Sequence, residues 1–151
     1  MRLTVYTDYA LRVLMYLAVR PTERPTIAGI AASYGISRNH LMKVVHELGR
    51  GGYVETLRGK GGGLALARRA EDIVLGEVIR HTEPDLALVP CFDPVNAACA
   101  ISSACRLRGA LHQAQAAFLQ VLDGYTLADL VENRGALAEA LLRTQPEPAG
   151  N

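Results

Sequence analysis

A short glycine turn between two amphipathic segments constrains this chain more than any other feature of its sequence. The turn is Tyr34-Gly35-Ile36-Ser37, and it separates TIAGIAASYG from RNHLMKVVHELGRGG. Thr26 is a good N-cap for the first segment, Gly35 suits the left-handed conformation that ends a helix, and Ser37 is a good N-cap for the second segment. This order predicts two helices packed across a tight turn, which is a helix-turn-helix.

The predicted elements on either side extend this unit. Residues 6–19 have the apolar period of a helix. Residues 53–57 and 64–67 alternate like strands on either side of Gly61-Gly62-Gly63, which predicts a β-hairpin. We therefore expect a fold that is mainly α with a small β-hairpin wing, and a winged helix-turn-helix DNA-binding domain over residues 1–82.

Charge is unevenly distributed along the chain. The net charge is only +1, but residues 1–80 carry twelve Lys and Arg against seven Asp and Glu, and residues 81–151 carry four against eight. Residues 38–69 alone hold seven basic and two acidic side chains. A basic face on a nearly neutral protein indicates a polyanionic partner. A solvated surface without a partner is the alternative interpretation.

Hydrogen-bond donors occupy two places where a winged helix meets double-stranded DNA. The first is the N-terminal part of the third helix, on the face away from its apolar stripe, where a recognition helix reaches base edges. Its residues are Arg38, Asn39, His40 and Lys43. The second is the wing tip, where Arg58 and Lys60 stand beside glycines that allow close approach to a backbone. We expect both to bind DNA, although winged helices also serve as protein–protein modules.

The second half of the chain is organised differently. Residues 83–105 are irregular and interrupted by prolines, which predicts a loop, and the three cysteines in it make this loop the candidate cluster-binding segment. We expect residues 103–145 to contain a long helix up to about Asp123, which makes a dimerisation helix, and short C-terminal elements, and we expect residues 146–151 to be a mobile tail. Apolar residues at 4-3-4-3 spacing predict a coiled-coil seam on the long helix, and hence a homodimer suited to a palindromic operator. They are Leu107, Leu111, Ala114, Phe118 and Val121.

Location and enzymatic activity are constrained by what the sequence lacks. No apolar run approaches the ~20 residues needed to span a bilayer, and Asp8 and Arg12 interrupt the N-terminal apolar stretch without a cleavage site after it. We expect a cytoplasmic protein with no membrane partner, whose thiols stay reduced. No acid–base pair or nucleophile–base arrangement is evident, so we do not expect an enzyme.

All three cysteines, Cys91, Cys99 and Cys105, lie in one turn-rich stretch, CFDPVNAACAISSAC. Buried structural cysteines would be dispersed through the core. Structural zinc sites favour thiols two to four residues apart, whereas here seven and five residues intervene. Iron–sulfur clusters are held by thiolates without such tight spacing. A redox switch between Cys99 and Cys105 is a further possibility, and it leaves Cys91 without a role.

Several stretches together resemble the bacterial iron–sulfur winged-helix transcription regulators. They are the start of the first helix, SRNHLMKVVHELGRGGYVET, the wing RGKGGGLALAR and the three-cysteine loop, and the resemblance covers residues 1 to about 140. The match is closest to the nitric-oxide-sensitive branch of that family. The branch that regulates cluster assembly has a histidine ligand shortly after the third cysteine, whereas here the nearest histidine is His112.

The resemblance implies an iron–sulfur cluster, 4Fe–4S in preference to 2Fe–2S, held by Cys91, Cys99 and Cys105. It implies Asp8 of the other protomer as the fourth ligand, with Asp93 and His112 as alternatives. A carboxylate is a harder ligand than a thiolate, so the iron it holds is the one that a diatomic molecule captures. A first-turn acid favoured by the helix dipole is the alternative role for Asp8.

The resemblance also implies a repressor that binds DNA while its cluster is intact and releases DNA when nitric oxide nitrosylates the iron. Asp8 and Arg12 are four residues apart on one helix face, which suggests a signal relay through Arg12, with an ordinary surface ion pair as the alternative. A regulator of the same build that responds to cluster supply, iron or redox state is the alternative function. A thiol-based redox protein is the alternative from another class.

Overall fold

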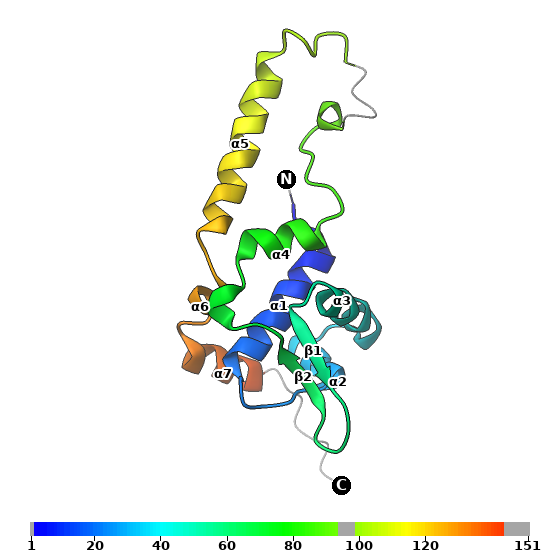
Figure 1. Cartoon of the computed structure of the whole chain (residues 1–151), viewed down its shortest axis with the longest axis vertical. Helices are drawn as coiled ribbons and strands as arrows, with labels where there is room; N and C mark the ends of the chain where they lie inside the picture. The colour runs from blue at the N-terminus through cyan, green and yellow to red at the C-terminus, as the bar shows by residue number, and fades with distance from the viewer. Residues whose placement is uncertain (1, 94–98, 144–151) are drawn as a thin grey trace.

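The structure, a computed structural model, describes residues 2–93 and 99–143 and confirms a mainly helical fold with one β-hairpin (Figure 1). The predicted tail, residues 146–151, lies outside the described residues, as do residues 144–145 of the C-terminal segment. The elements in chain order are α1 (Val5–Val19), α2 (Ile27–Tyr34), α3 (Arg38–Arg50), β1 (Val54–Leu57), β2 (Gly63–Leu66), the 3-10 turn η1 (Ala70–Asp72), α4 (Leu75–Thr82), the 3-10 turn η2 (Pro90–Phe92), α5 (Arg106–Asp123), α6 (Leu127–Leu130) and α7 (Arg134–Arg143).

The helix-turn-helix forms where the turn chemistry predicts it. The Thr26 hydroxyl accepts a hydrogen bond from the Gly29 amide at 3.1 Å and caps α2. Gly35 ends α2 with φ +63°, in the left-handed region that a glycine enters without a steric cost. Ser37 precedes α3 as predicted, but its side chain makes no capping bond. Position alone, with Gly35 before it, therefore sets the start of α3.

The wing is a two-stranded antiparallel hairpin in which Val54 pairs with Leu66 and Leu57 with Gly63. Its inner residues, Val54 and Leu64, are buried against the helices. The chain between α1 and α2 docks on β2, where the Leu64 amide donates to the Pro25 carbonyl at 2.9 Å. The hairpin is thus fixed at its root and projects at its tip (Figure 1).

The core is built around α1, which lies at the centre of the molecule (Figure 1). Helix α1 packs on α3, β2, α4, α6 and α7, and Tyr16 of α1 also contacts Tyr34 of α2. The residues with no exposed surface include Ala10, Val13, Leu14, Ile30, Leu41, Leu48, Ile73, Val78 and Val131. Leu127, Val131 and Leu141 of the C-terminal elements belong to this same core. The chain after α5 therefore returns to complete the winged-helix unit.

Helix α5 leaves this core. It is 18 residues long, roughly 27 Å at 1.5 Å per residue, and none of its residues is buried. Leu107 and Val121 of the predicted seam are 66% and 61% exposed. Figure 1 shows α5 projecting from the body of the molecule with the cysteine-containing segment at its far end. No helix within the described residues is long and apolar enough to cross a membrane.

Candidate nucleic-acid interface and cysteine segment

Helix α3 divides into a buried and an exposed face. Leu41, Val44, Val45 and Leu48 are buried, as their spacing predicts. The four predicted contact residues, Arg38, Asn39, His40 and Lys43, are all exposed. They lie in the first two turns of α3, on the side that faces away from the core. Their donors are therefore available to a partner, which is the placement that a recognition helix needs.

An aromatic contact that sequence reasoning missed joins α1 to this exposed face. The Tyr9 ring stacks on the His40 imidazole with centroids 6.4 Å apart and planes at 28°. The Tyr6 hydroxyl donates to the Lys43 carbonyl at 3.3 Å. Burial raises the pKa of Tyr6, so its hydroxyl stays a donor at neutral pH. Two tyrosines three residues apart on α1 were the available signal, because i and i+3 residues share a helix face.

The wing tip presents the other two predicted contact residues. Arg58 and Lys60 are exposed, and each is followed by a glycine with positive φ, +101° at Gly59 and +81° at Gly61. These conformations turn the chain sharply and leave both cations at the end of the hairpin. A tip of this shape brings two positive charges close to a phosphate backbone without bulky neighbours.

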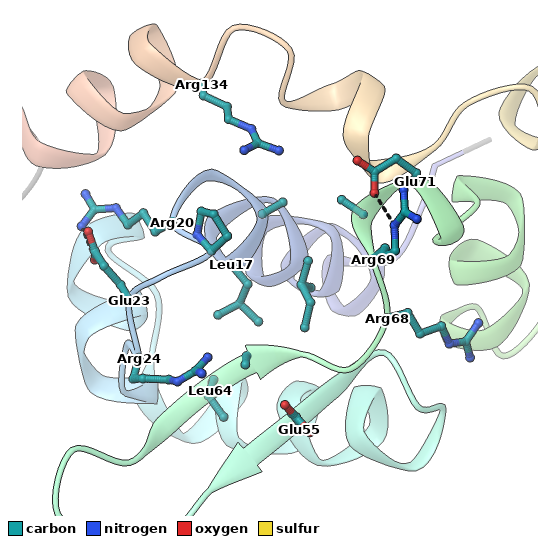
Figure 2. Close-up of a pocket in the computed structure, with 15 residues that line it drawn as sticks. Leu17, Arg20, Glu23, Arg24, Glu55, Leu64, Arg68, Arg69, Glu71 and Arg134 are labelled. Atoms are coloured by element: carbon teal, nitrogen blue, oxygen red, sulfur yellow. Dashed lines mark hydrogen bonds and ion pairs between the residues drawn. The ribbon is translucent and has the colours of Figure 1, made fainter.

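A cavity of about 400 Å³ lies beside the wing root, between the end of α1, β2 and the start of α7 (Figure 2). Five arginines and three glutamates line it, and none of the predicted site residues does. Ion pairs join Arg20 to Glu23 at 3.0 Å and Arg69 to Glu71 at 3.5 Å. The arginines and glutamates largely neutralise one another, and the small excess of arginine extends the positive surface next to the wing.

The three cysteines occupy the segment between α4 and α5 and are free thiols. Cys91 lies in η2 and is half-buried, and Cys99 is exposed. Cys105 is the N-cap of α5, where its sulfur accepts a hydrogen bond from the Arg108 amide at 3.4 Å. Within residues 2–93 and 99–143, no group of three His, Cys, Asp or Glu side chains is gathered closely enough to hold a metal ion.

Two contacts join α5 to the segment of the chain that carries Cys91. The Phe92 ring stacks on the His112 imidazole, with centroids 3.8 Å apart and planes at 12°. Lower down, the Gln115 side chain donates to the Leu86 carbonyl. His112, an alternative ligand, is thus engaged with Phe92, and Asp93, the other alternative, directly follows η2. Cys91 therefore lies on the part of the segment that leaves α4, and Cys105 lies on the part that enters α5.

Asp8 and Arg12 form the ion pair that their spacing predicts. The Asp8 Oδ2 atom lies 3.0 Å from the Arg12 Nε atom, and both side chains are nearly half exposed. The Arg12 guanidinium lies 5.7 Å from the centre of the Tyr34 ring, and the Tyr34 hydroxyl donates to the Arg12 carbonyl at 3.2 Å. Tyr34 is the last residue of α2, immediately before the turn. Asp8 is thus connected to the helix-turn-helix through two contacts.

The donor set fits a thiolate-held metal group. Three unpaired thiols lie on one segment outside the hydrophobic core, and one of them caps a helix. Asp8 belongs to α1, which lies within the body of the molecule, whereas α5 projects from that body with the cysteine-containing segment at its far end (Figure 1). Within the part of the chain that the structure describes, Asp8 and the cysteines are not gathered into one metal-binding group.

Comparisons with known proteins extend over nearly the whole chain. Residues 3–133 match the Rrf2 family model, described as iron-dependent transcriptional regulator. The HTH-type transcriptional regulators NsrR of Geobacillus kaustophilus and of Bacillus subtilis are each 53% identical over 142 residues, covering 93% of this chain and 97% of theirs. The structure of CymR, the global cysteine regulator of B. subtilis, superposes with a TM-score of 0.73 at 24% identity, covering 88% of this chain and 98% of that one.

Proposed function

Because the chain belongs to the Rrf2 family of transcriptional regulators, we propose that it is a homodimeric DNA-binding repressor that senses nitric oxide through an iron–sulfur cluster. One observation carries the proposal. The chain is 53% identical to the two NsrR regulators over almost their full length, and it has three free cysteines on a segment outside the core. The cluster type that we propose is 4Fe–4S, with 2Fe–2S as the alternative.

DNA binding is proposed to use α3 and the wing together. Arg38, Asn39, His40 and Lys43 reach base edges in the major groove, and Arg58 and Lys60 bind phosphate or the minor groove. The exposure of all six side chains on two adjoining elements supports this division. A two-fold dimer would present two such surfaces, which matches a palindromic operator.

Cys91, Cys99 and Cys105 are proposed to hold the cluster, with Asp8 of the second protomer as the fourth ligand. When bound, the cluster supplies iron that reacts with nitric oxide. Cys105 binds from a helix N-terminus, and the stacking of Phe92 on His112 keeps the segment that carries Cys91 against α5. A carboxylate holds iron less firmly than a thiolate does, which suits a site that must yield to a small ligand.

The signal is proposed to travel from Asp8 through Arg12 to the helix-turn-helix. Arg12 is shared between the Asp8 carboxylate and the Tyr34 ring, and Tyr34 precedes the Gly35 turn. When Asp8 is released from its ligand role, Arg12 changes position, and the packing of the Gly35 turn changes with it. The stacking of Tyr9 on His40 gives the same α1 segment a second contact, directly on α3.

The test is operator binding by anaerobically purified protein before and after a nitric-oxide donor. We expect a coloured protein containing iron and sulfide that binds operator tightly and loses affinity on exposure. Loss of affinity on iron chelation or on air oxidation, without a response to nitric oxide, would instead support the supply or redox alternative. A colourless protein that contains zinc, or that has only a disulfide-dependent response, would reject the cluster.

A further inference from the structure

The C-terminal end of α4 contacts three other helices through successive residues. We call Arg80, His81, Thr82 and the C-cap residue Glu83 the α4 tetrad. Consecutive helical residues point about 100° apart, so neighbours in sequence reach different elements. Arg80 reaches α5, His81 reaches α3, and Thr82 and Glu83 reach α1. Short as it is, α4 connects the cysteine-bearing helix, the recognition helix and the Asp8-bearing helix.

Arg80 holds the base of α5. Its guanidinium donates two hydrogen bonds to the Asp123 carboxylate, at 2.6 and 2.7 Å, in a bidentate pair. These bonds raise the pKa of Arg80 and lower that of Asp123, so both groups are charged at neutral pH. Asp123 is the last residue of α5, and Cys105 caps the first turn of the same helix. The pair therefore joins α4 to the end of α5 that is remote from Cys105.

His81 faces the end of the recognition helix. Its Nε2 atom lies 3.3 Å from the Glu47 carbonyl oxygen and 3.6 Å from the Glu47 carboxylate. Its ring packs on Tyr53, with centroids 5.5 Å apart. Gly51 lies so close that a Cβ atom there would be 2.6 Å from Nε2. A shift of α4 along this contact must displace the C-terminal turn of α3.

Thr82 and Glu83 bind the N-terminal turn of α1. The Thr7 hydroxyl donates to the Thr82 hydroxyl at 2.9 Å, and both residues are buried, with exposures of 0% and 6%. The Glu83 Oε1 atom accepts from the Thr4 amide at 2.8 Å and from the Thr4 hydroxyl at 3.1 Å. Thr4 is the N-cap of α1, and Asp8 lies one turn later. After Glu83, the chain continues into the segment that carries Cys91.

We infer that the α4 tetrad couples the cysteine segment to α1 and α3, and that Glu83 is a positioning residue for the regulatory response. The cysteine segment and α5 together connect to the winged-helix unit at two points. One is Glu83, just before the segment, and the other is Asp123, at the end of α5. Movement of that segment therefore reaches the DNA-binding face through the tetrad as well as through Asp8 and Arg12. This inference rests on the proposed function, because it assumes that the state of the cysteine segment controls DNA affinity.

The test compares the operator affinities of cluster-loaded and cluster-free protein, taken as a ratio, for four proteins. Glu83→Ala removes both bonds to Thr4. Glu83→Gln keeps an Oε1 acceptor and should restore most of the ratio. Glu77→Ala is the matched control, since Glu77 is an exposed carboxylate on the same helix whose ion pair with Arg68 is 3.9 Å long. We expect Glu83→Ala to lower the ratio by about tenfold, the scale of one hydrogen bond to a charged acceptor, with the control unchanged.

Hydrogen exchange of the cluster-free protein gives an independent readout. Exchange in the peptide containing Thr4 and Thr7 should be faster in Glu83→Ala than in the wild type or in Glu77→Ala. A fifth protein, Arg80→Lys, keeps the charge but loses the bidentate pair, and it should also lower the ratio. A wild-type ratio near one would overturn the proposed function. A large wild-type ratio that Glu83→Ala and Arg80→Lys both leave unchanged would overturn this inference alone.

Discussion

The contacts of Arg12 are weak individually and important through their position. An ion pair between side chains as exposed as Asp8 and Arg12 contributes about 0.3–0.5 kcal/mol to stability. The same guanidinium nevertheless lies over Tyr34, whose pKa is raised chiefly by burial, so this tyrosine keeps its proton and its bond to the Arg12 carbonyl. A small stabilising contribution combined with two well-placed contacts is what a signalling residue needs.

We therefore predict that Asp8→Ala separates signalling from folding. The free energy of unfolding of the cluster-free protein should change by less than about 1 kcal/mol, measured by urea denaturation. The loaded protein should retain its cluster with an altered visible spectrum and an altered response to nitric oxide. If spectrum, response and operator affinity all matched the wild type, Asp8 would have only a capping role on α1.

The DNA-binding residues should separate into two energetic kinds. Lys60→Ala should weaken binding to operator and to random DNA by similar factors and lower the salt slope by about one, because a phosphate contact carries no sequence information. Asn39→Ala should cost about 1–3 kcal/mol on the operator alone. Binding isotherms over a salt series on both DNAs measure the two effects. An operator-to-random ratio unaffected by Asn39→Ala would remove α3 from the reading role.

His40→Ala gives a further prediction, because this side chain has two partners. It should weaken operator binding more than random binding, as a base contact does, and it should also remove the stacking on Tyr9. Tyr9→Leu keeps the imidazole and removes only the stacking. If the two variants lose equal operator affinity, the contribution of His40 comes from its contact with α1 and not from a base edge.

At the scale of elements, local chemistry determined what could be predicted. Thr26 and Gly35 place α2 correctly because each acts on backbone atoms within a few residues. Ser37 was predicted to cap α3 with its side chain and does not, since a serine can precede a helix without turning its hydroxyl inward. The bond from Thr4 to Glu83 spans 79 residues and leaves no local pattern, so no sequence argument could find it. The stacking of Tyr9 on His40 was also missed: the spacing of Tyr6 and Tyr9 indicates a shared face on α1, but it does not say which element that face contacts.

The junction of α4 and α5 should weaken in acid. Hydrogen bonding to Arg80 lowers the pKa of Asp123 below its ordinary value. A carboxylate whose folded pKa is depressed contributes stability above its unfolded pKa, and loses it as the pH falls through the folded pKa. Wild type should thus be more stable than Asp123→Asn at neutral pH, and the difference should shrink below about pH 4. Urea denaturation of both proteins at several pH values measures it, with Asp72→Asn, which changes an exposed carboxylate in η1, as the control.

At the scale of the whole molecule, we expect the exposed apolar side chains of α5 to pack against a second copy of the chain. Val121 is 61% exposed at the end of α5 remote from the cysteines, which makes it a clean position to test. Val121→Glu should raise the dimer dissociation constant by at least about tenfold, because a two-fold axis uses the residue twice. Gln120→Glu adds the same charge on a neighbouring face and should leave dimerisation intact. Sedimentation equilibrium of both variants distinguishes the outcomes.

The lack of any buried residue on α5 has a consequence for dosage. Most helices in proteins owe their stability to the packing of a buried face, and α5 has no buried residue in the single chain. If a second copy supplies that packing, the order of α5 and of the segment attached to it rises with the amount of protein, by mass action. A cell making too few copies would then contain single chains in which the winged-helix core is folded but α5 and the segment that carries the cysteines are less ordered. Gene expression level would set both how strongly the targets are repressed and whether the repressor can respond at all.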